Sequence, residues 1–167
     1  MLQESDGLNG LTQQNFLASA LFDRTFDEGM ALVEETARYL DVRGREEARA
    51  LPRKASMLYA GESMRVTTRL MQAASWLLVQ RAVRDGDMEA EQAAGERYRL
   101  GSREICLGAC SESTEMLPVA LRDLLGRSDN LYRRIARLDD VLFNADQTLN
   151  AGARDHQNRL AQAFGVE

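Results

Sequence analysis

The side chains that most often carry metal or nucleophilic chemistry are scarce in this sequence of 167 residues. It has one histidine, His156, and two cysteines, Cys106 and Cys110. A closed structural zinc site takes four Cys or His ligands, and a Ser-His-Asp triad needs a positioned imidazole. The C-x3-C spacing could place both thiols on one helical face, so that a dimer offers four thiolates to a metal. Two free thiols in a linker are the simpler interpretation.

The carboxylates also fail to form a recognisable metal motif. Glu28, Glu34, Glu35 and Glu62 could suggest a carboxylate-bridged site in a helical bundle. Such sites need Glu-x-x-His pairs on facing helices, and the only histidine lies in a polar C-terminal stretch. We therefore predict no catalytic residue, no metal and no cofactor, and expect a binding or regulatory protein, not an enzyme.

Composition favours helices and argues against phosphate or membrane partners. The chain is 44% hydrophobic but only 6% aromatic, and has two prolines. Its net charge of −5 repels phosphate backbones unless a local basic patch outweighs it. No apolar run approaches the roughly 18 residues that span a bilayer. The first ten residues, MLQESDGLNG, lack the basic start and apolar core of a signal peptide, so we expect a cytoplasmic protein.

Hydrophobic periodicity predicts one all-α domain, 1–167, built as an elongated three-helix bundle. Thr12 is a plausible N-cap of the first helix, and Gly44 a plausible glycine just after its end. The predicted elements are a helix at about 13–42, a helix at about 52–85, a long flexible linker at 86–115, a helix at about 117–150 and a mobile tail at 151–167.

The middle helix carries two apolar stripes, and we expect both to be buried against neighbouring helices. The methionines among them are expected to fill the core. One stripe is Met57, Ala60, Met64, Thr67, Met71, Ala74 and Leu78; the other is Tyr59, Ser63, Val66, Leu70, Ala73 and Leu77.

The single tryptophan, Trp76, falls outside both stripes, on the face that carries Arg65 and Arg69. Val79 and Val83 lie on that face too. An exposed patch of this kind suits a dimer or partner interface, because Trp is over-represented at binding hot spots. Cover by the linker or the tail is the main alternative, and a small-molecule pocket is a third.

Further candidate contacts are basic or lie near the C-terminus. A solvated surface is the simplest interpretation of the arginines; docking of an acidic protein segment and nucleic-acid binding are the alternatives. These candidates are Arg43, Arg45 and Arg49 before the middle helix, Arg133 and Arg137 in the last helix, and Leu160 and Phe164 in the tail.

Two runs resemble a known bacterial family. They are FDEGMALVEETARYLD at Phe26–Asp41 and YAGESMRVTTRLMQAASWLLVQRA at Tyr59–Ala82, with a looser likeness in LYRRIARLD at Leu131–Asp139. Together they resemble the RcdA family, the regulators of CtrA degradation, over about Phe16 to Leu142. The second run is long and unusual in composition, which makes the match fairly specific.

The resemblance implies a three-helix bundle that forms a homodimer and has no catalytic motif. It implies an adaptor that works with a CpdR-type response regulator and delivers protein substrates, such as CtrA, to the ClpXP protease at the cell pole. Two alternatives from other classes stay open: a nucleic-acid-associated regulator that uses the arginine clusters, and a purely structural dimerisation module.

Overall fold

The computed structural model describes residues 13–109 and 113–143, and within these ranges the fold is all-α, with no strand. Residues 13–17 are helical. The other elements are α2 (Ala20–Asp41), α3 (Arg43–Ala50), α4 (Arg53–Asp85), α5 (Ala90–Ala93), the 3-10 turn η1 (Glu96–Tyr98), α6 (Arg103–Leu107), the 3-10 turn η2 (Thr114–Met116) and α7 (Val119–Phe143).

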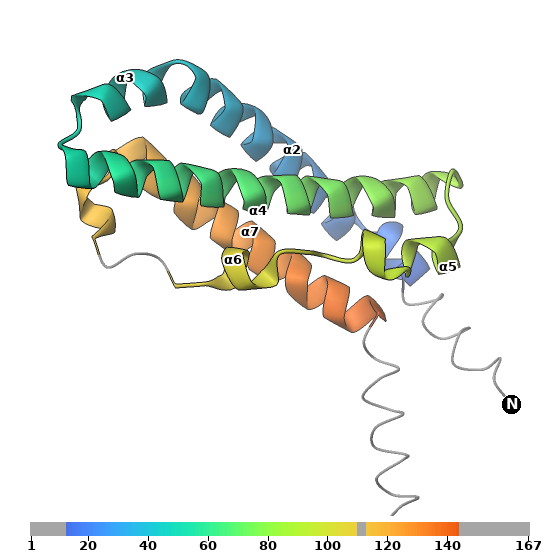
Figure 1. Ribbon diagram of the computed structural model, residues 1–167. Coiled ribbons are helices and arrows are strands. Elements are labelled where there is room, and N and C mark those ends of the chain that lie inside the picture. Colours follow the sequence, from blue (N-terminus) through green and yellow to red (C-terminus); the bar gives the residue numbers. More distant parts are fainter. Residues whose placement is uncertain (1–12, 110–112, 144–167) are drawn as a thin grey trace, which may run out of the picture.

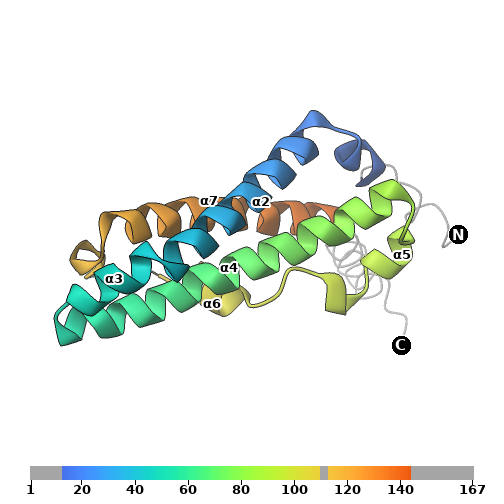
Figure 2. The same ribbon diagram turned by 90° about the horizontal axis from the view of Figure 1, so that it is seen from above.

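The long helix α4 is the centre of the arrangement. It packs against both α2 and α7, which cross it at different angles (Figures 1 and 2). Its bounds follow from two residues: Pro52 stands at the N-cap, and Gly86 ends the helix with a left-handed φ of 80°. These bounds lie where the sequence predicts a helix at 52–85.

The first predicted helix, 13–42, is wrong as a single element. The side chain of Ser19 caps α2 by accepting a hydrogen bond from the backbone N–H of Phe22, and its hydroxyl donates to the carbonyl of Phe16. The chain turns there, so that the ring of Phe16 meets that of Phe22 edge-on at 5.6 Å between centroids. The proposed N-cap, Thr12, lies outside the described residues.

Gly44 does not end the first helix, because α2 stops at Asp41 and Gly44 lies inside α3. It is buried against Tyr59, and a Cβ added there would stand 2.5 Å from the Tyr59 hydroxyl oxygen. Close packing of α3 on α4, not a left-handed backbone, is what this glycine provides.

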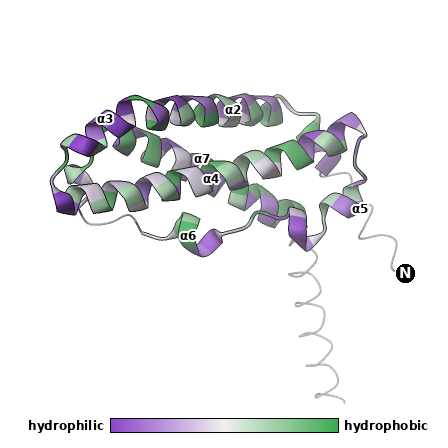
Figure 3. Ribbon diagram, turned by 45° about the horizontal axis from the view of Figure 1, so that its top comes forward, coloured by the Kyte–Doolittle hydropathy of each residue, from purple (hydrophilic) through white to green (hydrophobic). Residues whose placement is uncertain are grey.

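The expectation of a flexible linker at 86–115 is wrong for its described part. This segment contains α5, η1, α6 and η2, and it runs back along α4 on the side opposite α2 (Figure 3). Three of its residues, Ala93, Leu100 and Cys106, are buried in the core. The last helix, α7, runs without interruption through Gly126 and Ser128; the predicted extension to 150 and the tail lie outside the described residues.

Candidate interaction surface

The helix α4 has two faces with unusual contents. Glu62, Arg69 and Trp76 follow one another at seven-residue spacing, and each is at most 3% exposed. We call this row the closed face, because the returning segment 99–109 and α7 cover it. A Trp among charged residues was expected to face solvent, and the structure places the whole row inside.

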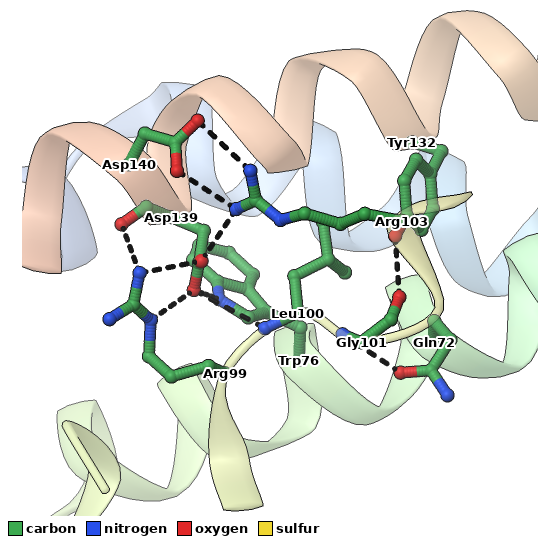
Figure 4. A network of polar contacts seen from close by, with 9 residues as sticks. All are labelled: Gln72, Trp76, Arg99, Leu100, Gly101, Arg103, Tyr132, Asp139 and Asp140. Atoms are coloured by element: carbon green, nitrogen blue, oxygen red, sulfur yellow. Dashed lines mark hydrogen bonds and ion pairs between the residues drawn. The ribbon is translucent and has the colours of Figure 1, made fainter. Parts of the chain in front are cut away.

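An ion cluster around Asp139 of α7 holds the closed face together (Figure 4). Asp139 is 1% exposed and accepts a hydrogen bond from the Trp76 indole N–H, at 2.8 Å between Nε1 and Oδ1. Arg99 binds both carboxylate oxygens, with Nε to Oδ1 at 3.0 Å and Nη2 to Oδ2 at 2.9 Å. Arg103 adds a 2.8 Å contact from Nη2 to Oδ2. The cluster therefore ties the returning segment to both α4 and α7.

The pKa of the Asp139 carboxyl lies below its ordinary value. Burial alone raises this pKa, but the hydrogen bonds from Arg99 and Trp76 lower it and outweigh burial. Asp139 is consequently ionised in the fold at neutral pH, with its charge compensated by two arginines. A buried carboxylate so fully partnered is a structural group.

Arg69 and Arg65 hold the next part of the returning segment. Arg69 is fully buried: its Nε donates to the Cys106 carbonyl at 2.8 Å, and its Nη2 lies 2.9 Å from Oδ1 of Asp129. Arg65 donates from Nη1 to the Ala109 carbonyl at 2.7 Å. Both arginines, offered above as interface contacts, therefore serve the fold.

The expected exposed patch around Trp76 does not exist. Trp76 is 1% exposed, and besides its bond to Asp139 it contacts the ring of Phe16, with centroids 6.4 Å apart. Val79 and Val83 are half-buried beside it. The alternative held open above, cover by the linker, is the correct one for Trp76, and residues 13–17 add to that cover.

The opposite side of α4, by contrast, is open and apolar. Met57, Met64, Met71 and Leu78 recur every seven residues and are 70%, 71%, 67% and 52% exposed. We call this row, with the small residues between its members, the open face. The prediction that these methionines fill the core is wrong, and of the two stripes only the one through Tyr59, Val66, Leu70 and Leu77 is buried.

The open face carries no exposed charge along most of its length. Within α4, all of which the structure describes, the charged residues between Lys54 and Arg81 are Glu62, Arg65 and Arg69. Two of these are buried, and Arg65 turns to the returning segment. Monomeric proteins seldom leave a large apolar patch open, so such a face indicates an interaction site.

The open face continues onto α2 through a groove between the two helices. Val33, Ala37 and Leu40 line it from α2, and Met71 and Leu78 from α4. The residues of α2 that enter the core lie one position away, at Leu32, Thr36 and Tyr39. In the groove row Ala37 is exposed, and Val33 and Leu40 are partly buried against the core.

The arginine clusters are largely paired within the chain. Arg43 lies 2.7 Å from Glu47, Arg45 lies 3.2 Å from Asp41, and Arg133 lies 2.7 Å from Asp129. Arg49 borders a second groove beside Met64, and Arg137 is exposed on α7. The acidic partners weaken any local field that would attract phosphate.

The remaining candidates are one buried cysteine and four residues that the structure does not describe. Cys106 is buried, which raises the pKa of its thiol, while Cys110, His156, Leu160 and Phe164 lie outside the described residues. Within the described residues no three His, Cys, Asp or Glu side chains gather so as to hold a metal ion. In the same part of the chain, no helix combines the length and apolarity that a membrane crossing requires.

Comparison with known proteins identifies the family. Residues 13–164 match the family described as "Protein of unknown function (DUF1465)". The crystal structure of RcdA from Caulobacter crescentus CB15 is 52% identical, with a TM-score of 0.64, and the match covers 78% of this chain and 97% of that one. The chain belongs to the RcdA family. No curated protein matches it.

The open face is what the sequence interpretation missed, although a signal for it was present. A helix buried on two sides rarely carries Glu62 and Arg69 at the same heptad position as its only Trp. Had charge been weighed along α4 as heavily as hydrophobicity, the row Met57, Met64 and Met71 would have emerged as a surface.

Proposed function

We propose that this protein is a non-enzymatic adaptor in regulated proteolysis. In this role it would tether substrates, such as a CtrA-type cell-cycle regulator, to a ClpXP-type protease primed by a CpdR-type response regulator. The observation that carries the proposal is the 52% identity to RcdA across 97% of that chain. The proposal includes a homodimer built on a three-helix bundle, working in the cytoplasm at the cell pole.

Tethering needs surfaces and no reactive group. Two weak contacts on one scaffold make the second binding event intramolecular, with an effective concentration in the millimolar range for short connections. The described residues fit this requirement, because their ionisable clusters serve packing and one long helix face is left apolar. Adaptors gain their effect from proximity, so a rigid scaffold with separate surfaces is sufficient.

The contacts with other proteins are proposed at charged positions away from the closed face. Arg49 beside Met64, and Arg137 on α7, are exposed and suit an acidic partner surface. Leu160 and Phe164 remain proposed contacts in the C-terminal stretch. Exposed charges of this kind raise association rates and select partners more than they add affinity.

A reconstituted degradation assay tests the proposal. Purified protease, response regulator and a CtrA-type substrate are combined at concentrations where the substrate alone is degraded slowly, and this protein is then added. We expect faster degradation that requires the response regulator. In a cytosolic pull-down with this protein as bait, recovery of only the bait under gentle conditions, together with no acceleration in the assay, would refute the adaptor role.

Nucleic-acid binding is separated from the adaptor role by salt. If the arginine clusters bound nucleic acid, affinity would fall steeply with salt and would require Arg43, Arg45 or Arg133. We expect no such binding, since each of these arginines lies within ion-pair distance of an acidic residue of the same chain.

A further inference from the structure

The groove between α2 and α4 is a cavity of about 490 Å³, a size typical of pockets that hold small molecules. Apolar side chains line it along most of its length, among them Val33 of α2 and Met71 and Leu78 of α4. Thr36 and Leu70, which also line it, are buried and form its floor. None of the described side chains that line it carries a charge. The groove can therefore take up an apolar chain without burying an ion.

One end of this groove is basic. A second groove, of about 480 Å³, meets the first at Leu40 and Thr67, which line both. Arg45 and Arg49 of α3 border the second groove, and both are exposed. Arg45 lies 3.2 Å from Asp41, whereas Arg49 forms no ion pair with any described residue. The place where the two grooves meet is thus close to a guanidinium group whose charge is not compensated by the described chain.

A buried hydroxyl near the same place has no hydrogen-bond partner among the described residues. Thr36 is 3% exposed and lines the apolar groove one helical turn before Leu40. Its Oγ1 makes no hydrogen bond, although a helical threonine can donate to the carbonyl four residues earlier, as Thr25 does to Leu21. Buried polar atoms are almost always partnered in folded proteins. The unpartnered hydroxyl therefore points to a ligand atom that accepts from it.

We propose that this groove binds a long-chain fatty acid, with the acyl chain in the apolar cavity and the carboxylate where the two grooves meet. The carboxylate accepts a hydrogen bond from the Thr36 hydroxyl and pairs with the guanidinium groups of Arg49 and Arg45, which are strong partners for a carboxylate. The inference goes beyond the adaptor role and does not depend on it, because it assigns a small-molecule ligand to a surface of the single chain.

The length and the depth of the groove both favour an acyl chain. From Thr67 to Leu78 α4 rises about 16 Å, a distance that an extended chain of a dozen methylene groups covers. Each methylene group that leaves water raises the affinity about fourfold. An acidic helix of another protein is the main alternative occupant. Such a helix is about 10 Å wide and its backbone groups are already paired, so it would rest on the rims and offer no acceptor to Thr36.

Uptake of cis-parinaric acid, a long-chain fatty acid that fluoresces when it leaves water, tests the inference. A trace of the acid is titrated with the full-length protein, and its uncharged methyl ester is titrated in parallel. We expect a dissociation constant of roughly 10–100 µM for the acid, since a single acyl chain enters a bilayer with an association constant of about 10⁴ M⁻¹. The ester should bind about fivefold more weakly, because it cannot pair with the arginines.

A bulky residue in the groove tests where the chain lies. Ala37 is exposed and lines the groove, so Ala37→Phe should fold normally and weaken the acid and the ester alike by more than about tenfold, the equivalent of two buried methylene groups. The matched control is Ala31→Phe, because Ala31 is also exposed on α2 but does not line the groove. We expect this control to bind like the wild type. Circular dichroism of both variants verifies that the helices form.

Two further variants test where the carboxylate lies. Arg49→Gln should weaken the acid about twofold and leave the ester unchanged, and Arg122→Gln, which removes an equally exposed charge from α7, should change neither. Thr36→Val keeps the side-chain shape but removes the hydroxyl. It should also weaken the acid and not the ester, while the melting temperature of the ligand-free protein rises, because an unpartnered polar atom leaves the core.

Four results would overturn the inference: a wild type that takes up no acid, an Ala37→Phe variant that binds like the wild type, an Ala31→Phe variant that binds as weakly as Ala37→Phe, or equal binding of acid and ester. Vesicles of phosphatidylglycerol distinguish the free acid from a lipid bilayer. If the protein binds these vesicles but takes up no free acid, the ligand is a membrane surface and the inference fails. If it binds neither, the groove is left to a protein helix or a second copy, and the inference fails as well.

Discussion

The two faces of α4 invert the usual distribution of side chains. On the closed face Glu62, Arg69 and Trp76 are buried, whereas on the open face Met64 and Met71 are about two-thirds exposed or more. The closed face can hold these groups because α7 and the returning segment provide partners for Arg69 and Trp76, while Glu62 lies 3.7 Å from Arg65 of α4. The open face has no such cover within the described chain. Which side chains of α4 are buried therefore depends more on the segments that cover them and the polar partners they find than on residue type.

The largest expected difference between the faces is in stability. Replacing Trp76 with Ala leaves a cavity and removes the indole donor from Asp139, so we expect a loss of about 3–5 kcal/mol in the free energy of unfolding. Leu78→Ala, on the open face, should change it by less than about 0.5 kcal/mol in dilute solution. Urea denaturation of both variants measures the contrast, and equal losses would mean that the two faces are not distinct.

A second test removes the charge at the centre of the closed face. Asp139→Asn keeps the side-chain shape but removes the buried charge that Arg99 and Arg103 both contact, and Arg103 keeps only its ion pair with Asp140. Breaking such a cluster should cost about 3 kcal/mol. The neighbouring carboxylate of Asp140 is 46% exposed, so Asp140→Asn should cost at most about 1 kcal/mol. Thermal unfolding of the two variants compares them, and a larger loss for Asp140→Asn would contradict this account of the cluster.

The same carboxylate predicts how stability depends on pH. The pKa of Asp139 is lower in the fold than its ordinary value of 3.8, so the folded chain binds fewer protons in this range. Its contribution is complete above that ordinary value and is lost as the pH falls through the lowered pKa. Chemical denaturation from pH 6 downward should show a steeper acid loss for the wild type than for Asp139→Asn. Parallel curves would assign the acid sensitivity to other groups.

Substitutions of two glycines should have effects of opposite sign. A Cβ at Gly61 on α4 meets nothing within 4 Å, so Gly61→Ala should stabilise the monomer by about 0.5–1 kcal/mol. At Gly44 the added Cβ would stand 2.9 Å from the Tyr39 carbonyl oxygen, and Gly44→Ala should destabilise by about 1–3 kcal/mol. Calorimetry at low protein concentration measures both. A destabilising Gly61→Ala would show that this side of α4 is covered.

The sequence could predict the helices whose ends are marked by proline or glycine, or whose buried side has regular apolar spacing. Pro52 and Gly86 bracket α4, and the four-three spacing from Leu121 to Leu142 marks the buried side of α7. The break at Ser19 was missed because the apolar spacing continues across it. Only the contact between Phe16 and Phe22 shows why the chain turns.

The sides of α4 could not be assigned from its hydrophobic pattern alone. The helical wheel correctly grouped Arg65, Arg69 and Trp76 on one face, and separated them from the methionines. Which group faces solvent depends on Asp129 and Asp139, which lie far along the chain on α7. General rules place Met inside and Arg outside, so they give the wrong answer wherever distant partners compensate a buried charge.

Oxidation of the methionines by dilute peroxide tests the central claim most directly, because methionine oxidation follows exposure. Mass spectrometry follows Met57, Met64 and Met71 in dilute protein, with Met116, 37% exposed outside α4, as the internal reference. We predict that the three residues are oxidised at least as fast as Met116. Slower oxidation of the three residues than of Met116 would show that the open face is covered within the single chain.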